Sequence, residues 1–97
     1  MDERDIPPGD FLIERDGLGP GRRLLKRAAG DTDIVDGDLR VLATIRFDVA
    51  LETLALFVHD PPRSAGDAHR SGRRLAAGAT PDELLAAFLE EPAAAVA

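Results

Sequence analysis

The chain has 97 residues and a mass of 10.3 kDa, which excludes a multi-domain enzyme and leaves room for one small core. Its net charge of −6 at pH 7 disfavours non-specific binding to nucleic acid or to an anionic membrane, because an acidic surface repels phosphate. The absence of cysteine excludes disulfides, thiolate zinc sites and thiol nucleophiles, so we expect an intracellular, cytoplasmic protein.

The first third of the chain predicts a strand followed by a short helix. Residues 1–9 are expected to form a disordered lead that ends in Pro7-Pro8-Gly9. The apolar run at residues 11–13 predicts a strand, and the glycine-rich segment 17–21 then interrupts the chain. A helix is predicted over residues 22–29, because leucines and alanines share one face and Gly30 follows as a C-cap.

The middle of the chain predicts a β-hairpin. Asp36-Gly37 stands between Ile34-Val35 and a second extended run, which is typical of a tight hairpin turn. In the run at residues 39–47 every odd position is apolar, and this period of two indicates a strand. The alternation continues formally to Leu51, so the end of this strand stays open.

Two more helices and a loop are predicted after residue 48. Asp48 is a suitable N-cap, and a helix over residues 51–58 would place leucine, alanine and valine on one face before two prolines end it. Residues 61–72 carry no large apolar side chain and predict a mobile loop. A short helical piece is expected at residues 73–77, ending at Gly78.

The last element is a helix with a clear start signal. The sequence Thr80-Pro81-Asp82-Glu83 combines an N-cap threonine, a proline at N1 and a glutamate at N3, and Pro92 would end the helix. Residues 92–97 are expected to be a frayed tail. The whole pattern predicts a single α+β domain over residues 10–91, with a small, mostly antiparallel sheet and three to four short helices.

The glycine-rich segment is the best candidate for a small-ligand site. Backbone N–H groups next to arginines at a helix start favour an anion, and the alternative is a flexible turn. The spacing is neither the dinucleotide fingerprint nor a P-loop. The candidate anion-binding residues are Gly19, Gly21, Arg22 and Arg23.

No catalytic, metal or cofactor site is predicted. The acidic run at residues 31–38 does not fit an EF-hand, because the twelfth position from Asp31 is Leu42 instead of a glutamate. His59 and His69 are the only imidazoles, and neither has the spacing of a zinc site or a nucleophile in a matching motif. Both are expected at the surface.

We therefore expect a non-enzymatic protein-binding module, such as a small adaptor, a regulatory subunit or a neutralising partner of another protein. The partner surface would combine the apolar face of the last helix with a basic loop, although that face is first of all a core candidate. Its residues are Leu84, Leu85, Phe88 and Leu89, with Arg73 and Arg74. Homodimerisation stays open, and no membrane contact is expected.

The alternative function is a DNA-binding regulator. Residues 75–85 predict a helix, a glycine turn and a capped helix, and this layout is similar to the helix-turn-helix of small bacterial antitoxins. The capped helix carries acids, so a dimer would present arginines from elsewhere to the phosphates, namely Arg22, Arg23, Arg70, Arg73 and Arg74. The basic loop itself consists of Arg63, Arg70, Arg73 and Arg74.

Overall fold

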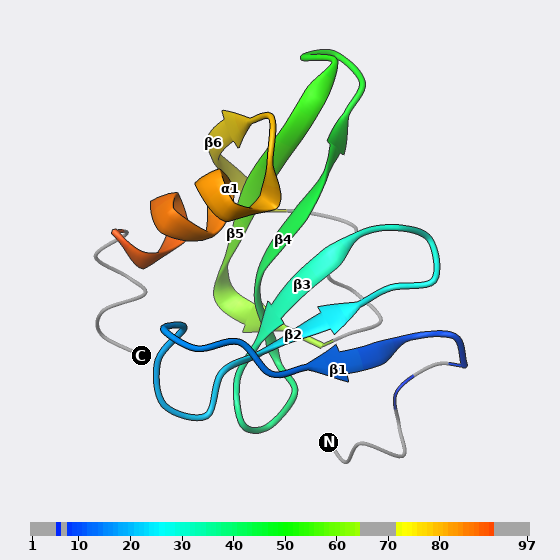
Figure 1. Ribbon diagram of the computed structural model, residues 1–97, viewed down its shortest axis with the longest axis vertical. Helices are drawn as coiled ribbons and strands as arrows, with labels where there is room; N and C mark the ends of the chain where they lie inside the picture. The colour runs from blue at the N-terminus through cyan, green and yellow to red at the C-terminus, as the bar shows by residue number, and fades with distance from the viewer. Residues whose placement is uncertain (1–5, 7, 65–71, 91–97) are drawn as a thin grey trace.

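The computed structural model describes residues 6, 8–64 and 72–90, which form one six-stranded antiparallel sheet and one helix (Figure 1). The strands lie side by side in chain order, so each one pairs with its neighbour in sequence. The elements are β1 (Phe11–Ile13), β2 (Arg23–Lys26), β3 (Thr32–Val35), β4 (Val41–Asp48), β5 (Thr53–Arg63), β6 (Arg73–Gly78) and α1 (Pro81–Leu89). The expected tail at 92–97 and most of the expected lead and loop lie outside the described residues.

The fold is mostly β, and the prediction of an α+β domain with three to four short helices is wrong. The segments predicted as helices at residues 22–29, 51–58 and 73–77 instead form β2, the first part of β5 and most of β6. Helix propensities differ by only tenths of a kcal/mol per residue, so pairing with a neighbouring strand and burial outweigh them. The strand at residues 11–13, the hairpin around residues 34–47 and the last helix are confirmed.

The turn between β3 and β4 is longer than the predicted two residues. The backbone N–H of Asp36 donates to the carbonyl of Arg40 at 3.0 Å, and Leu39 has a positive φ of 62°. The Asp36 carboxylate accepts the N–H groups of Asp38 and Arg40, both at 2.9 Å. Leu39 therefore leaves the strand, and its side chain is buried beneath the turn.

A large irregularity in the pairing with β4 allows β5 to run through the two prolines that were expected to end a helix. Val41 pairs with Arg63 and Ala43 with Val58, so Leu42 alone faces the four residues 59–62. The regular ladder is interrupted at a bulge, and a missing proline N–H costs no strand pairing there. The first residues of the expected loop at 61–72 consequently belong to β5.

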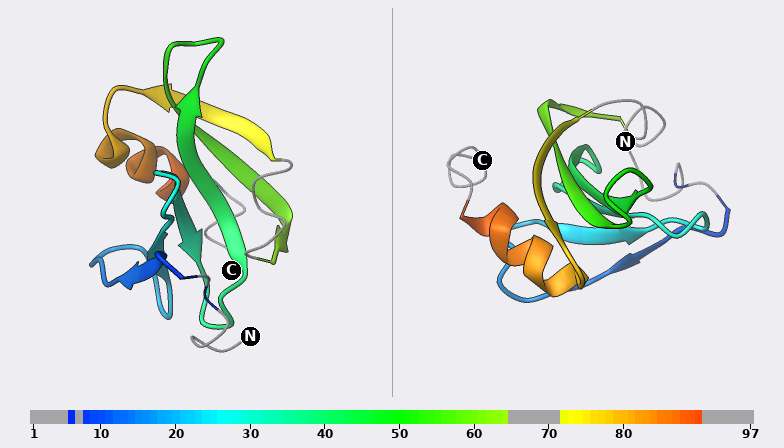
Figure 2. Two further views of the ribbon diagram at one scale, coloured as in Figure 1. Left: turned by 90° about the vertical axis from the view of Figure 1, so that its right-hand side faces the viewer. Right: turned by 90° about the horizontal axis from the view of Figure 1, so that it is seen from above.

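The main core lies between the sheet and α1, which packs on one side of the curved sheet (Figure 2). The helix contributes Leu84, Leu85 and Phe88 to this core, all nearly inaccessible to solvent. Neighbouring residues of a strand point to opposite faces, so Leu24 joins this core and Leu25 joins a second, smaller one. The second core consists of Leu25, Val35, Leu39 and Val41.

Candidate functional site

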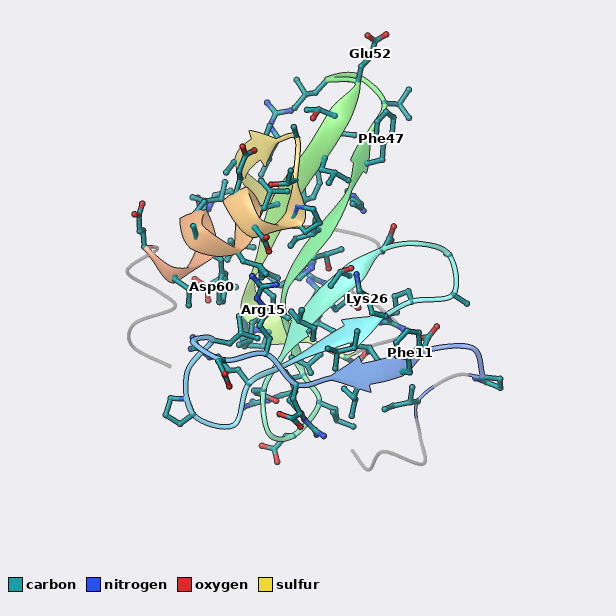
Figure 3. The ribbon with its side chains drawn as sticks, viewed as in Figure 1. Phe11, Arg15, Lys26, Phe47, Glu52 and Asp60 are labelled. Carbon is teal, nitrogen blue, oxygen red and sulfur yellow. The ribbon has the colours of Figure 1, made fainter. Side chains whose placement is uncertain are left out.

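The tip of the β4–β5 hairpin is an exposed apolar surface. Phe47 is 58% exposed, Val49 80% and Leu51 40%, and these are three of the five large apolar side chains exposed among the described residues. Figure 3 shows Phe47 and Glu52 at the upper end of the molecule, far from Phe11 on β1. We call Phe47, Val49 and Leu51 the hairpin tip.

Hydrogen bonds within the turn hold the hairpin tip in one shape. The Asp48 carboxylate accepts the backbone N–H groups of Ala50 at 2.9 Å and Leu51 at 3.3 Å. The N–H of Glu52 donates to the carbonyl of Val49 at 3.3 Å. The second oxygen of Asp48 lies 3.5 Å from the guanidinium of Arg74 on β6, which links the turn to the neighbouring strand.

The predicted partner residues fall into two groups. Leu84, Leu85 and Phe88 belong to the main core, so the core interpretation of the helix face is confirmed and these side chains offer no surface to a partner. Only Leu89 remains exposed, at 42%. The arginines Arg73 and Arg74 are exposed on β6, where Arg74 lies beside the hairpin turn.

The sequence interpretation missed the hairpin tip because it placed residues 51–58 in a helix. The signal was present in the apolar alternation that continues past Phe47 through Val49 to Leu51. Because residues 47–51 form the end of β4 and the following turn, this alternation places the three apolar side chains at the end of a hairpin instead of on a helix face.

The helix-turn-helix layout predicted for residues 75–85 is absent. Residues 73–78 form β6, so a strand precedes α1 where the first helix was expected. Of the predicted basic loop, Arg63 ends β5 and Arg73 and Arg74 begin β6, whereas Arg70 lies outside the described residues.

The four predicted anion-binding residues are brought together at one open hollow of about 770 Å³. Gly19, Gly21, Arg22 and Arg23 line it with the side chain of Arg15, and the turn between β3 and β4 adds a further wall. The lining also includes the acids Glu14 and Asp16. No helix begins at this segment, since β2 follows it, so the expected helix N-terminus does not contribute to an anion site.

Arg22 is oriented across this hollow by its own neighbours. One of its guanidinium nitrogens donates to the carbonyl of Leu18 at 3.3 Å, and the guanidinium carbon lies 5.6 Å from the centre of the Phe88 ring. Gly19 has a φ of 113°, a backbone conformation that favours glycine, and a Cβ there would lie in van der Waals contact with Cδ of Arg22 at 3.4 Å. The side chain is therefore packed on the protein instead of extending into solvent.

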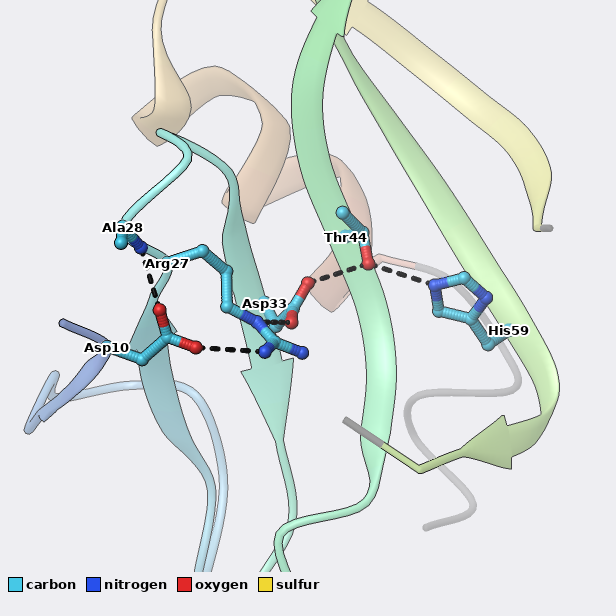
Figure 4. Close-up of polar contacts among 6 residues, drawn as sticks. All are labelled: Asp10, Arg27, Ala28, Asp33, Thr44 and His59. Carbon is cyan, nitrogen blue, oxygen red and sulfur yellow. Dashed lines mark hydrogen bonds and ion pairs between the residues drawn. The ribbon is translucent and has the colours of Figure 1, made fainter. Parts of the chain in front are cut away.

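A chain of polar contacts crosses the sheet from strand to strand (Figure 4). Asp10 contacts Arg27 at 3.0 Å, and the Nε of Arg27 donates to Asp33 at 2.6 Å. The hydroxyl of Thr44 donates to the other oxygen of Asp33 at 2.8 Å, and Nε2 of His59 lies 2.9 Å from the same hydroxyl. We call these five residues the polar chain.

The polar chain is buried at its centre and at its His59 end. Asp33, Thr44 and His59 are each at most 3% exposed, which contradicts the expectation that His59 lies at the surface. The reason is the pairing of β4 with β5: Thr44 lies opposite Phe57, so His59, two residues further on, faces the same side of the sheet and reaches the Thr44 hydroxyl. The other histidine, His69, lies outside the described residues.

The two basic members of the polar chain respond to burial in different ways. Burial acts to lower the pKa of Arg27, but hydrogen bonds to Asp33 and Asp10 and their negative charges outweigh it and raise the pKa. Burial lowers the pKa of His59; the charge of Asp33 opposes this effect, and the charges of Arg63 and Arg46 add to it. Arg27 is thus held as a cation, whereas His59 is held neutral.

Within residues 6, 8–64 and 72–90, no group of three or more histidines or carboxylates is arranged to hold a metal ion. The helix in this part of the chain is too short to cross a membrane. No protein-family model, no curated protein and no solved structure matches the chain.

Proposed function

We propose that this protein is a non-enzymatic protein-binding module that anchors its partner through the hairpin tip. The observation that carries the proposal is the exposure of three apolar side chains at the end of one hairpin, whose turn is held by hydrogen bonds to Asp48. Contiguous apolar surface is costly to leave in water, and a preordered turn loses little conformational entropy when a partner covers it. In this proposal the protein acts in the cytoplasm as an adaptor or regulatory subunit.

The size of the hairpin tip favours a different protein over a second copy of this chain. Its three side chains expose on the order of 300 Å². A stable interface buries about 800 Å² on each partner, so two tips packed against each other would fall well short. A concave apolar pocket on another protein would bury the tip fully, and the exposed Glu52 and Arg74 would then lie at the rim.

The proposal is tested by affinity purification of the tagged protein from its native cells, with and without nuclease. We expect one stoichiometric protein to co-purify with the wild type even after nuclease treatment. The triple variant Phe47→Thr, Val49→Thr and Leu51→Thr should recover at least about tenfold less of that protein, since anchor residues carry most of the binding energy. Threonine keeps strand propensity, so circular dichroism should be unchanged.

The matched control is Phe11→Thr with Leu89→Thr, which removes exposed apolar surface elsewhere on the protein. Equal loss of the partner in the control and tip variants would contradict the proposal. Replacing both Arg73 and Arg74 with glutamate addresses the alternative function. Nuclease-sensitive DNA that is lost in this variant, with protein partners unaffected, would favour a DNA-binding regulator.

A further inference from the structure

The hydrogen bonds of the polar chain have only one consistent direction. An ionised Asp33 can only accept, and it accepts from Arg27 on one oxygen and from the Thr44 hydroxyl on the other. The single hydroxyl proton of Thr44 is therefore used, so its oxygen accepts from His59. Neutral His59 consequently carries its proton on Nε2 and a lone pair on Nδ1.

The Nδ1 atom of His59 is buried and has no hydrogen-bond partner within the part of the chain that the structure describes. Gly72 packs directly on the ring: a Cβ there would lie 3.0 Å from Cε1 and 3.2 Å from Nδ1. A bare lone pair is tolerable in such a place, but a buried cationic N–H without an acceptor is far more costly.

The charges around His59 come from three strands. Asp33 on β3 favours a proton on the ring, but it meets the Nε2 side of the ring through the Thr44 hydroxyl and leaves Nδ1 without an acceptor. Arg46 on β4 and Arg63 at the end of β5 oppose the proton, and the Arg46 guanidinium is held 4.1 Å from the centre of the Phe57 ring. The other two contacts of the ring, Thr44 and Gly72, are uncharged.

From this geometry we propose that His59 is an acid-sensitive latch that holds the β5 bulge against β4. Protonation of Nδ1 would place an unsatisfied N–H and a second positive charge in the buried site. The ring would then leave Thr44 for solvent, and residues 59–62 would detach while the rest of the sheet stays paired. The latch is closed at neutral pH and opens under mild acid.

The sign of the pH effect follows from linkage. The pKa of His59 in the folded protein lies below the ordinary value of 6.5, so the open state binds more protons in the range between them. The stability that the closed latch contributes is fully present above pH 6.5 and is lost as the pH falls toward the folded pKa. Over that range the opening constant rises by up to about tenfold per pH unit.

The experiment is native-state hydrogen exchange of the backbone amides around residues 58–60 between pH 7.5 and 5.5, with intrinsic exchange rates divided out. We expect protection in the wild-type protein to fall several-fold, by at most about tenfold, and protection in His59→Gln to change less than about twofold, because its amide can donate to Thr44 but does not titrate. The variant His69→Gln removes the other imidazole and should behave as wild type.

Equal pH dependence in the wild type and in His59→Gln would overturn the proposal. A second measurement on the wild type covers the case in which His59→Gln does not fold. Two-dimensional ¹⁵N–¹H spectra at pH 7.5 report which ring nitrogen is protonated, and a neutral ring with its proton on Nε2 is expected. A proton on Nδ1, or a ring already cationic at this pH, would also overturn it.

Discussion

Asp33 uses both of its carboxylate oxygens to join strands that are not all neighbours. One oxygen accepts from Arg27 at the end of β2, and the other accepts from Thr44 on β4. Arg27 in turn contacts Asp10, whose second oxygen accepts the N–H of Ala28 at 2.7 Å. The buried carboxylate of Asp33 therefore ties the segment before β1, through Arg27, to the centre of the sheet.

At the residue scale, we predict that Asp33→Asn destabilises the protein strongly. The amide has nearly the same shape but no charge, so the largely buried Arg27 cation loses the negative charge of Asp33 and keeps that of Asp10. Breaking a buried pair from one side costs about 3–5 kcal/mol. The free energy of unfolding in urea measures the loss.

The matched control is Asp38→Asn. The exposed carboxylate of Asp38 lies 3.9 Å from Arg40, and its replacement should change stability by less than about 0.5 kcal/mol. Similar losses in the two variants would show that burial does not strengthen the pair.

At the element scale, α1 begins where the capping sequence places it. The Thr80 hydroxyl accepts the N–H of Glu83 at 3.4 Å, and the Glu83 carboxylate accepts the N–H of Ala79 at 2.9 Å. In a capping box the glutamate returns to the N-cap residue itself, whereas here it reaches one residue further back. The start of the helix is thereby joined to the end of β6.

We predict that Thr80→Ala lowers the unfolding free energy by about 1 kcal/mol, since it leaves an N–H of the first turn without its partner. Thr80→Ser keeps the hydroxyl and should lose only a few tenths of that amount. Thermal unfolding of the two variants beside the wild type provides the comparison. An alanine variant as stable as the serine variant would mean that Pro81 and Glu83 are sufficient to start the helix.

Sequence patterns correctly predicted the elements whose signal lies within their own residues. They failed for segments whose conformation is decided by pairing with another strand. The odd-numbered apolar residues of β4 and the cap at Thr80 need no knowledge of neighbours, and both were predicted correctly. In β5 the run Thr53–Val58 is apolar at nearly every position, so it shows neither the helix period nor the strand period. Pairing with β4 decides its conformation.

The candidate sites show the same division. The glycine-rich segment and its arginines were found from composition, and they do line one hollow. The hairpin tip was hidden by the wrong helix, and the contact between Thr44 and His59 depends on the register that places Thr44 opposite Phe57. Spacing along the chain does not specify that register, because residues 51–58 were assigned to a helix.

At the scale of the whole molecule, three arginines line the hollow beside the glycine-rich segment, on a protein with a net charge of −6. Glu14 and Asp16 share this lining, and Arg15 also pairs with Asp82 at 2.6 Å, so the three positive charges meet three negative charges. Such a site would hold a small anion weakly, and added salt should compete with it.

We predict that inorganic phosphate produces saturable chemical-shift changes at the amides of residues 17–21, and that Arg22→Gln with Arg23→Gln abolishes the saturation. Arg40→Gln is the control, because Arg40 is exposed and does not line the hollow. Chemical-shift changes that grow linearly with phosphate concentration, equally in the wild type and both variants, would contradict a specific site and indicate only non-specific screening.

The order of the strands also determines the order in which the core can be completed. Every strand pairs with the strand that precedes it, so each hairpin can close as soon as its second strand has been synthesised. The helix that covers the main core comes after all six strands, and it alone supplies Leu84, Leu85 and Phe88. On the ribosome, the sheet can therefore assemble step by step while its apolar face remains uncovered. The side chains that exclude water from that face arrive only with α1, after all six strands have been synthesised.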